Sequence, residues 1–139
     1  MKERERTRIV KFRILIVDDE PGICEIFSYI LKKHGYESVR SFVDGLEAAK
    51  AFENDPNFAD IVLIDYRMPG MDGLTAGRII KKINPNVKLV MISAFEDPPV
   101  KVHDEIFDGV LRKPVNQEQL ICATESVTSV GKCPNATSA

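Results

Sequence analysis

The run Ile61-Val62-Leu63-Ile64-Asp65 decides the fold, because it is the most apolar stretch of the chain and ends on a carboxylate. Such a run is typical of a strand that is buried on both faces of a parallel sheet. A second run of the same kind, Arg13-Ile14-Leu15-Ile16-Val17, ends at Asp18 and Asp19. We therefore expect two neighbouring buried strands, each followed by acidic side chains.

Outward from these two runs, the pattern alternates between strand and helix. Further strands are expected over 36–42, 88–92 and 109–112, and helices are expected after Pro21, Asp44, Asp72 and Asn116. Regular alternation favours right-handed crossovers and a parallel sheet covered on both faces. The predicted fold is α/β and flavodoxin-like, a doubly wound five-stranded sheet in the order 2-1-3-4-5. Its fourth helix should be short or irregular, since Pro98-Pro99 bars a helix before that point.

The helices also carry start signals and apolar faces. Asp44, Asp72 and Asn116 are predicted N-caps, which satisfy free amide groups of the first helical turn. Two apolar stripes are expected to face the core; they comprise Ile23, Ile26, Phe27, Ile30 and Leu31 in the first helix, and Leu46, Ala49 and Phe52 in the second.

Length and composition narrow the class of protein. The 139 residues fit one domain, for which we predict the bounds 12–128, with a charged lead-in over 1–11 and a tail over 129–139. The net charge is −2, from 19 basic and 21 acidic residues, which argues against a nucleic-acid or membrane binder. No apolar run is long enough to cross a bilayer and no signal peptide is visible, so a cytoplasmic location is expected.

Five polar residues fall at the predicted strand ends: Asp18, Asp19, Asp65, Ser93 and Lys113. In a doubly wound sheet, ligands bind beyond the carboxyl ends of the strands, so these side chains should converge. Three carboxylates in one cleft repel each other, and a single lysine neutralises too little of their charge. A hard divalent cation with oxygen ligands, Mg²⁺, would solve this problem.

This set of residues is typical of phosphoryl transfer, and each member has a predicted role. Asp65 would be the nucleophile that forms an aspartyl phosphate. Asp19 would bind the metal directly, Asp18 through water, and the backbone carbonyl of Arg67 would complete the protein ligands. Lys113 would balance the charge on the phosphoryl oxygens, and the hydroxyl of Ser93 would donate a hydrogen bond to them.

At these residues the chain resembles the receiver domains of two-component response regulators. The resemblance rests on Ile14-Leu15-Ile16-Val17-Asp18-Asp19-Glu20-Pro21, Leu63-Ile64-Asp65-Tyr66-Arg67-Met68-Pro69-Gly70-Met71-Asp72-Gly73, Ser93-Ala94 and Lys113-Pro114. It implies a histidine kinase as phosphoryl donor, and either a downstream protein or a missing output domain as recipient of the signal. It also implies that the domain is no enzyme, and catalyses only its own phosphorylation and dephosphorylation.

Two departures from the family pattern fall on its usual signalling face. Val110 stands where receivers usually carry Tyr or Phe, and Pro98-Pro99 opens the fourth helix segment. We hypothesise a changed output surface with intact chemistry. The resemblance also places Arg67 and Phe95 beside the attacking water, where they would tune the lifetime of the phosphoryl group or simply line the rim.

Three other functions compete with that of a phosphoacceptor. A degenerate receiver would act as an interaction module without phosphorylation, although all five site residues are retained. A phosphatase with an aspartyl-phosphate intermediate usually has a second acid two residues after the nucleophile, where Arg67 stands here. A flavin carrier would need a phosphate-binding loop after the first strand. His34 and His103 are expected to be a helix C-terminal residue and a surface residue, not phosphotransfer groups.

Overall fold

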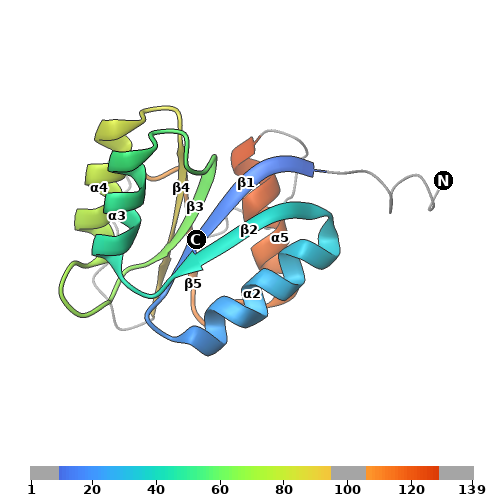
Figure 1. Ribbon diagram of the computed structural model, residues 1–139. Coiled ribbons are helices and arrows are strands. Elements are labelled where there is room, and N and C mark those ends of the chain that lie inside the picture. Colours follow the sequence, from blue (N-terminus) through green and yellow to red (C-terminus); the bar gives the residue numbers. More distant parts are fainter. Residues whose placement is uncertain (1–9, 95–105, 129–139) are drawn as a thin grey trace.

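The computed structural model describes residues 10–94 and 106–128, so the predicted tail, most of the lead-in and the fourth helix segment lie outside the described residues. The described part contains five strands and four helices (Figure 1). In chain order they are β1 (Val10–Val17), α2 (Pro21–His34), β2 (Tyr36–Phe42), α3 (Gly45–Asn54), β3 (Ile61–Asp65), α4 (Gly73–Ile83), β4 (Lys88–Ser93), β5 (Gly109–Arg112) and α5 (Gln117–Thr128).

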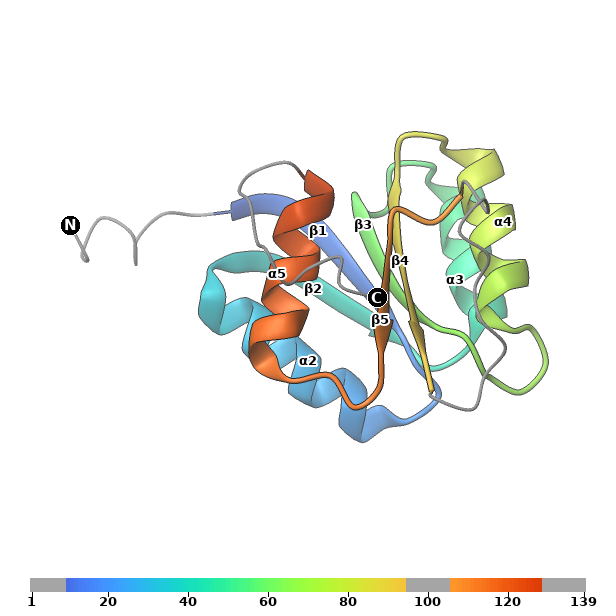
Figure 2. The same ribbon diagram turned by 180° about the vertical axis from the view of Figure 1, so that it is seen from behind.

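The strands form a single parallel sheet in the order β2-β1-β3-β4-β5, which confirms the predicted topology. β1 and β3 lie side by side at its centre, with Leu15 opposite Val62 and Leu63 opposite Val90 of β4. Helices α2 and α5 cover one face, and α3 and α4 cover the other (Figures 1 and 2). The chain therefore folds as three layers, with the sheet in the middle.

The core is divided by the sheet into two halves, because successive residues of a strand point to opposite faces. On the α2 and α5 side, Ile16 and Leu63 pack with Phe27 of α2. On the α3 and α4 side, Val17 and Ile64 belong to the other half of the core. Both central strands are thus apolar on both faces, which explains why their sequences do not alternate with polar residues.

Three of the helices begin as the sequence predicts. Asp44 accepts a hydrogen bond from the amide of Leu46, and Asp72 accepts one from the amide of Thr75. Asn116 and Gln119 form a reciprocal pair, in which each side chain accepts the other residue's amide. These bonds satisfy amides that have no partner inside the helix, and so fix where each helix starts.

Several local predictions are wrong. β1 begins at Val10, three residues before the expected start at Arg13. Ile26 is 54% exposed and Leu46 is 44% exposed, so neither lies on the buried stripe predicted for its helix. The buried face of α2 is set by Cys24, Phe27 and Leu31, and a helix turns by about 100° per residue, so Ile26 projects to one side of it. Ala48 takes the core position in α3.

Within the described ranges, none of the helices has both the length and the apolar character that crossing a membrane would require.

Candidate functional site

The five predicted site residues all lie where strands of the sheet end. Asp18 and Asp19 directly follow β1, Asp65 is the last residue of β3, Ser93 is the last residue of β4, and Lys113 directly follows β5. Because parallel strands end on the same edge, the topology carries these side chains to one rim. The prediction of convergence is therefore confirmed for the backbone positions of all five.

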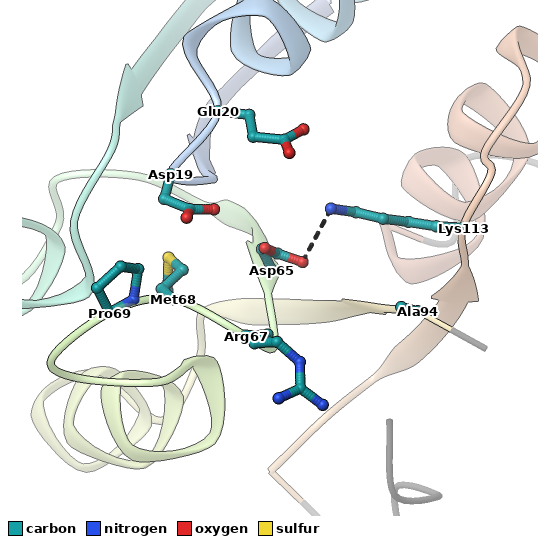
Figure 3. A pocket seen from close by; sticks show the side chains of 8 residues that line it. All are labelled: Asp19, Glu20, Asp65, Arg67, Met68, Pro69, Ala94 and Lys113. Carbon is teal, nitrogen blue, oxygen red and sulfur yellow. Dashed lines mark ion pairs between the residues drawn. The ribbon is translucent and has the colours of Figure 1, made fainter. Parts of the chain in front are cut away.

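The acidic side chains and the lysine also meet in space, and Figure 3 shows Asp19, Asp65 and Lys113 of this group. One carboxylate oxygen from each of Asp18, Asp19 and Asp65 lies within 4.8 Å of the others. The Nζ atom of Lys113 lies 3.2 Å from Oδ1 of Asp65 and 3.4 Å from Oδ2 of Asp18. The ammonium group thus bridges two of the three carboxylates, while Asp19 faces Asp65 from the opposite side (Figure 3).

Backbone hydrogen bonds beyond the strands hold this rim together. The amide of Tyr66 donates to the carbonyl of Ile92 at 2.8 Å, and the amide of Lys113 donates to the carbonyl of Ser93 at 2.8 Å. The ladder of hydrogen bonds between strands therefore continues one residue past β3 and one residue past β5. Asp65 and Lys113 are both held in register with β4 as a result. Ser93, the last residue of β4, is 2% exposed and lies between β3 and β5.

The close approach of α4 to the end of β3 depends on a glycine, Gly73. The amide of Gly73, at the start of α4, donates to the carbonyl of Tyr66 at 2.8 Å. A Cβ atom at position 73 would lie 2.2 Å from the carbonyl oxygen of Asp65, well inside van der Waals contact. Only glycine lets α4 approach the end of β3 this closely. The conformation of the loop from Asp65 to α4 thus depends on Gly73.

Burial and mutual repulsion disturb the protonation of the acidic cluster. Burial, together with the charge of Asp18, raises the pKa of Asp65 to about 6, although Lys113 opposes the shift. Burial also raises the pKa of Asp18. Burial would lower the pKa of Lys113, but Asp65 and Asp18 outweigh it, and the pKa of the ammonium group is raised. One lysine therefore holds its proton firmly, but does not compensate three carboxylates.

One oxygen of the cluster lacks a hydrogen bond. Oδ1 of Asp18 accepts the amide of Glu20 at 2.9 Å, whereas Oδ2 is buried and has no hydrogen-bond donor, Lys113 being at ion-pair distance only. Buried polar atoms are almost always hydrogen-bonded, so an oxygen that has only an ion pair with Lys113 has capacity for a further partner. A hard cation is the chemical partner that suits a set of three carboxylates. The residues present fit a Mg²⁺ ion.

The rim opens into a cavity of about 490 Å³. Eight residues line it: Asp19, Glu20, Asp65, Arg67, Met68, Pro69, Ala94 and Lys113 (Figure 3). Sequence reasoning named four of these as site residues, and missed Glu20, Met68, Pro69 and Ala94. Each of these four missed residues lies within four positions of a predicted site residue. Closeness along the chain was therefore the signal that could have identified them as lining residues. Asp18 and Ser93 are almost completely buried and are not among the lining residues.

Other residues singled out in the sequence lie away from this cavity or outside the described part. His34 ends α2, as predicted, and its Nε2 atom lies 2.8 Å from Oε2 of Glu125 in α5. Val110 lies in β5 and is partly buried. Phe95, Pro98-Pro99 and His103 fall outside the described residues.

A family model and a curated relative both match the sequence of this chain. The family described as "Response regulator receiver domain" matches residues 14–125. Among curated proteins, the chain is 36% identical over 83 residues to a chemotaxis protein, CheY, of Treponema pallidum (strain Nichols), an alignment that covers 60% of this chain and 58% of that protein. The match thus spans less than two thirds of this relative's length.

Solved structures agree with the fold. A response regulator receiver domain protein from Clostridium thermocellum has a TM-score of 0.78 and 27% identity, covering 86% of this chain and 95% of that one. The CheX–CheY–BeF3–Mg²⁺ complex from Borrelia burgdorferi has a TM-score of 0.75 and 26% identity, covering 84% of this chain and 89% of that one.

Proposed function

Because the chain belongs to the response regulator receiver domain family of two-component signalling, we propose that it accepts a phosphoryl group on Asp65 in a reaction that requires Mg²⁺. The observation that carries the proposal is the meeting of Asp18, Asp19 and Asp65 within 4.8 Å, with the ammonium group of Lys113 3.2 Å from Asp65 and 3.4 Å from Asp18. A permanently unphosphorylated interaction module would not need such a costly cluster of like charges.

The proposed donor is a phosphohistidine of a histidine kinase. A carboxylate oxygen of Asp65 attacks phosphorus, an O–P bond forms, the N–P bond to the donor histidine breaks, and its ring nitrogen leaves with the bonding electrons and is then protonated. Lys113, which already lies 3.2 Å from Asp65, compensates the charge of the transferred group. Ser93 donates its hydroxyl to one phosphoryl oxygen.

The protein ligands of the cation would be Asp19 and Asp65 directly, Asp18 through water, and the backbone carbonyl of Arg67. When bound, Mg²⁺ neutralises negative charge on the transferring phosphoryl group. The solved complex of the Borrelia CheY contains Mg²⁺ together with BeF3, so Mg²⁺ is the metal to test first. Asp18 is buried and does not line the cavity, so it would add negative charge to the site without filling the space for the phosphoryl group.

As a signalling domain, the chain would pass its state to a downstream protein or to a further output domain by docking, and would work in the cytoplasm without binding nucleic acid or entering a membrane. Its only catalysis would be its own phosphorylation and dephosphorylation. We propose residues 12–128 as the functional unit, with 1–11 and 129–139 as flanking segments. The match to residues 14–125 supports these bounds.

Phosphorylation with a small acyl phosphate tests the proposal. Intact-mass measurement after incubation with acetyl phosphate should show one added phosphoryl group with Mg²⁺, and none with EDTA. Asp65→Asn, which keeps the shape of the side chain, should remain unmodified in both conditions. Absence of modification in the wild-type chain at millimolar Mg²⁺ would instead favour the degenerate interaction module.

A further inference from the structure

The thiol of Cys24 contacts the backbone that carries the predicted metal ligands. Cys24 lies in the first turn of α2 and is 4% exposed. Its Sγ atom donates to the carbonyl oxygen of Asp18 at 3.4 Å, and lies 3.9 Å from the carbonyl oxygen of Phe42. The Phe42 carbonyl also accepts the amide of Asp18 at 3.1 Å. One thiol therefore contacts the ends of β1 and β2 from the helix that covers them.

The Asp18 carbonyl belongs to the peptide plane that joins Asp18 to Asp19. Fixing that carbonyl fixes the rotation of the plane, and with it the direction in which the two successive side chains leave the backbone. Further hydrogen bonds close the loop: the amide of Glu20 donates to Oδ1 of Asp18, and the amide of Cys24 donates to the carbonyl of Glu20 at 3.3 Å. The turn from β1 to α2 is therefore held at both ends.

A second, independent observation indicates that this turn serves a ligand. Asp18 is 1% exposed and belongs to the three-carboxylate cluster, yet its Oδ2 atom makes no hydrogen bond and has an ion pair with Lys113 as its polar contact. Mg²⁺ accepts little deviation from octahedral geometry, so its affinity depends on how well its ligands are positioned. Groups that orient such ligands change metal affinity even though they do not touch the metal.

We propose that Cys24 is a positioning residue for the cation site: its thiol orients the Asp18–Asp19 peptide, so that the two carboxylates meet Asp65 at the spacing a divalent cation needs. This inference rests on the proposed function, because it presupposes that the acidic cluster binds Mg²⁺. It adds a residue that does not line the cavity and that no motif of the sequence identified.

The test compares Cys24→Ala, which removes the donor, with Cys24→Ser, which restores a donor of similar size. Mg²⁺ alone is titrated into the full unphosphorylated chain, and amide cross-peaks in ¹H–¹⁵N spectra report the dissociation constant. Urea unfolding in EDTA measures the stability of each variant separately. Thr124→Ala is the matched control, since Thr124 is buried and its hydroxyl donates to the carbonyl of Leu120 within α5, away from the site.

We expect Cys24→Ala to weaken Mg²⁺ binding by roughly threefold to tenfold, less than a typical outer-shell mutation because a thiol is a weak donor. Cys24→Ser should bind Mg²⁺ within about twofold of the wild type, and Thr124→Ala should lose stability with no change in affinity. Equal Mg²⁺ affinity in Cys24→Ala and the wild type, or equal weakening in both Cys24 variants, would overturn the positioning role alone. A wild-type chain that binds no Mg²⁺ would overturn the proposed function as well.

Discussion

Asp65 is a buried carboxylate that lies close to two other carboxylates. It is 4% exposed, faces Asp18 and Asp19, and is compensated by one ammonium group. Its raised pKa means that the metal-free protein resists the ionised state that a nucleophile needs. A bound cation would favour that state, because an opposite charge nearby lowers the pKa of a carboxylic acid. Cation binding and ionisation of Asp65 are thus expected to be linked.

Asp65→Asn should stabilise the metal-free domain at pH 7. The pKa of Asp65 rises from 3.8 to about 6 on folding, so the folded state loses stability when this group ionises. The substitution removes the ionisable group, and the expected gain is on the order of 3 kcal/mol, since the pKa differs by about two units and each unit corresponds to about 1.4 kcal/mol. Urea unfolding in EDTA at pH 7 measures the gain.

The sign of the pH dependence provides the control for this substitution. A carboxyl group with a raised pKa in the folded state destabilises that state progressively as pH rises from about 4 to about 6, and fully above it. The stability advantage of Asp65→Asn should therefore shrink towards zero as pH falls to 4. An advantage of the same size at pH 4 and pH 7 would show that repulsion around Asp65 is not its cause.

Lys113→Gln should separate cation binding from phosphoryl transfer. Without the ammonium group that lies 3.2 Å from Asp65 and 3.4 Å from Asp18, the cluster becomes more negative. Mg²⁺ should then bind several-fold more tightly, while phosphorylation by acetyl phosphate slows, because the transferred group loses its compensating charge. Weaker Mg²⁺ binding by this variant, measured by titration, would contradict the assigned role of Lys113.

At the scale of elements, the approach of α4 to β3 depends on one glycine. Gly73→Ala would place a methyl group 2.2 Å from the carbonyl oxygen of Asp65, where backbone must move to make room. We expect a loss of unfolding free energy of at least about 2 kcal/mol, together with weaker Mg²⁺ binding. Thermal unfolding and a Mg²⁺ titration on the same samples would measure both.

The control for this substitution is Gly22→Ala in the first turn of α2, where no heavy atom lies within 4 Å of the added Cβ. Alanine is the better helix former by about 1 kcal/mol, so Gly22→Ala should leave stability unchanged or slightly raise it. Comparable losses in the two variants would mean that the close contact below Asp65 is not what makes Gly73 necessary.

Sequence pattern predicted the elements better than it predicted their orientation. Two apolar runs and the alternating pattern around them identified the five strands of the described sheet, and Asp44 and Asp72 marked the starts of their helices because capping chemistry is local. The rotation of each helix against the sheet was less predictable. Ile26 and Leu46 continue an apolar stripe in sequence but are exposed, since packing against the sheet selects the buried side.

For the molecule as a whole, the site is a product of topology. Asp18, Asp65 and Lys113 are far apart in the sequence, and only the strand order brings them together. Alternation of strands and helices predicted that order, which is why the five site positions could be predicted. The pairing of Lys113 with Asp18 as well as Asp65, and the contact of Cys24 with Asp18, could not be predicted, because they depend on side-chain packing.

Mg²⁺ should stabilise the entire fold, because the proposed cation site is assembled only in the folded chain, from the segments at the ends of β1 and β3. A ligand at about 100 times its dissociation constant adds about 2.7 kcal/mol to the free energy of unfolding. Urea unfolding with and without Mg²⁺ should show this increment in the wild type and lose most of it in Asp19→Asn. An equal increment in Asp19→Asn would place the bound ion elsewhere.

The most direct measurement is a crystal structure of the chain grown with Mg²⁺ and beryllium trifluoride. We predict one Mg²⁺ with oxygen ligands from Asp19, Asp65 and the carbonyl of Arg67, at the distance of about 2.1 Å that this ion requires, and a BeF3 group bound to Asp65 and contacted by Lys113. A Mg²⁺ ion bound away from these carboxylates, or an acidic cluster without a cation while BeF3 is bound to Asp65, would contradict the account.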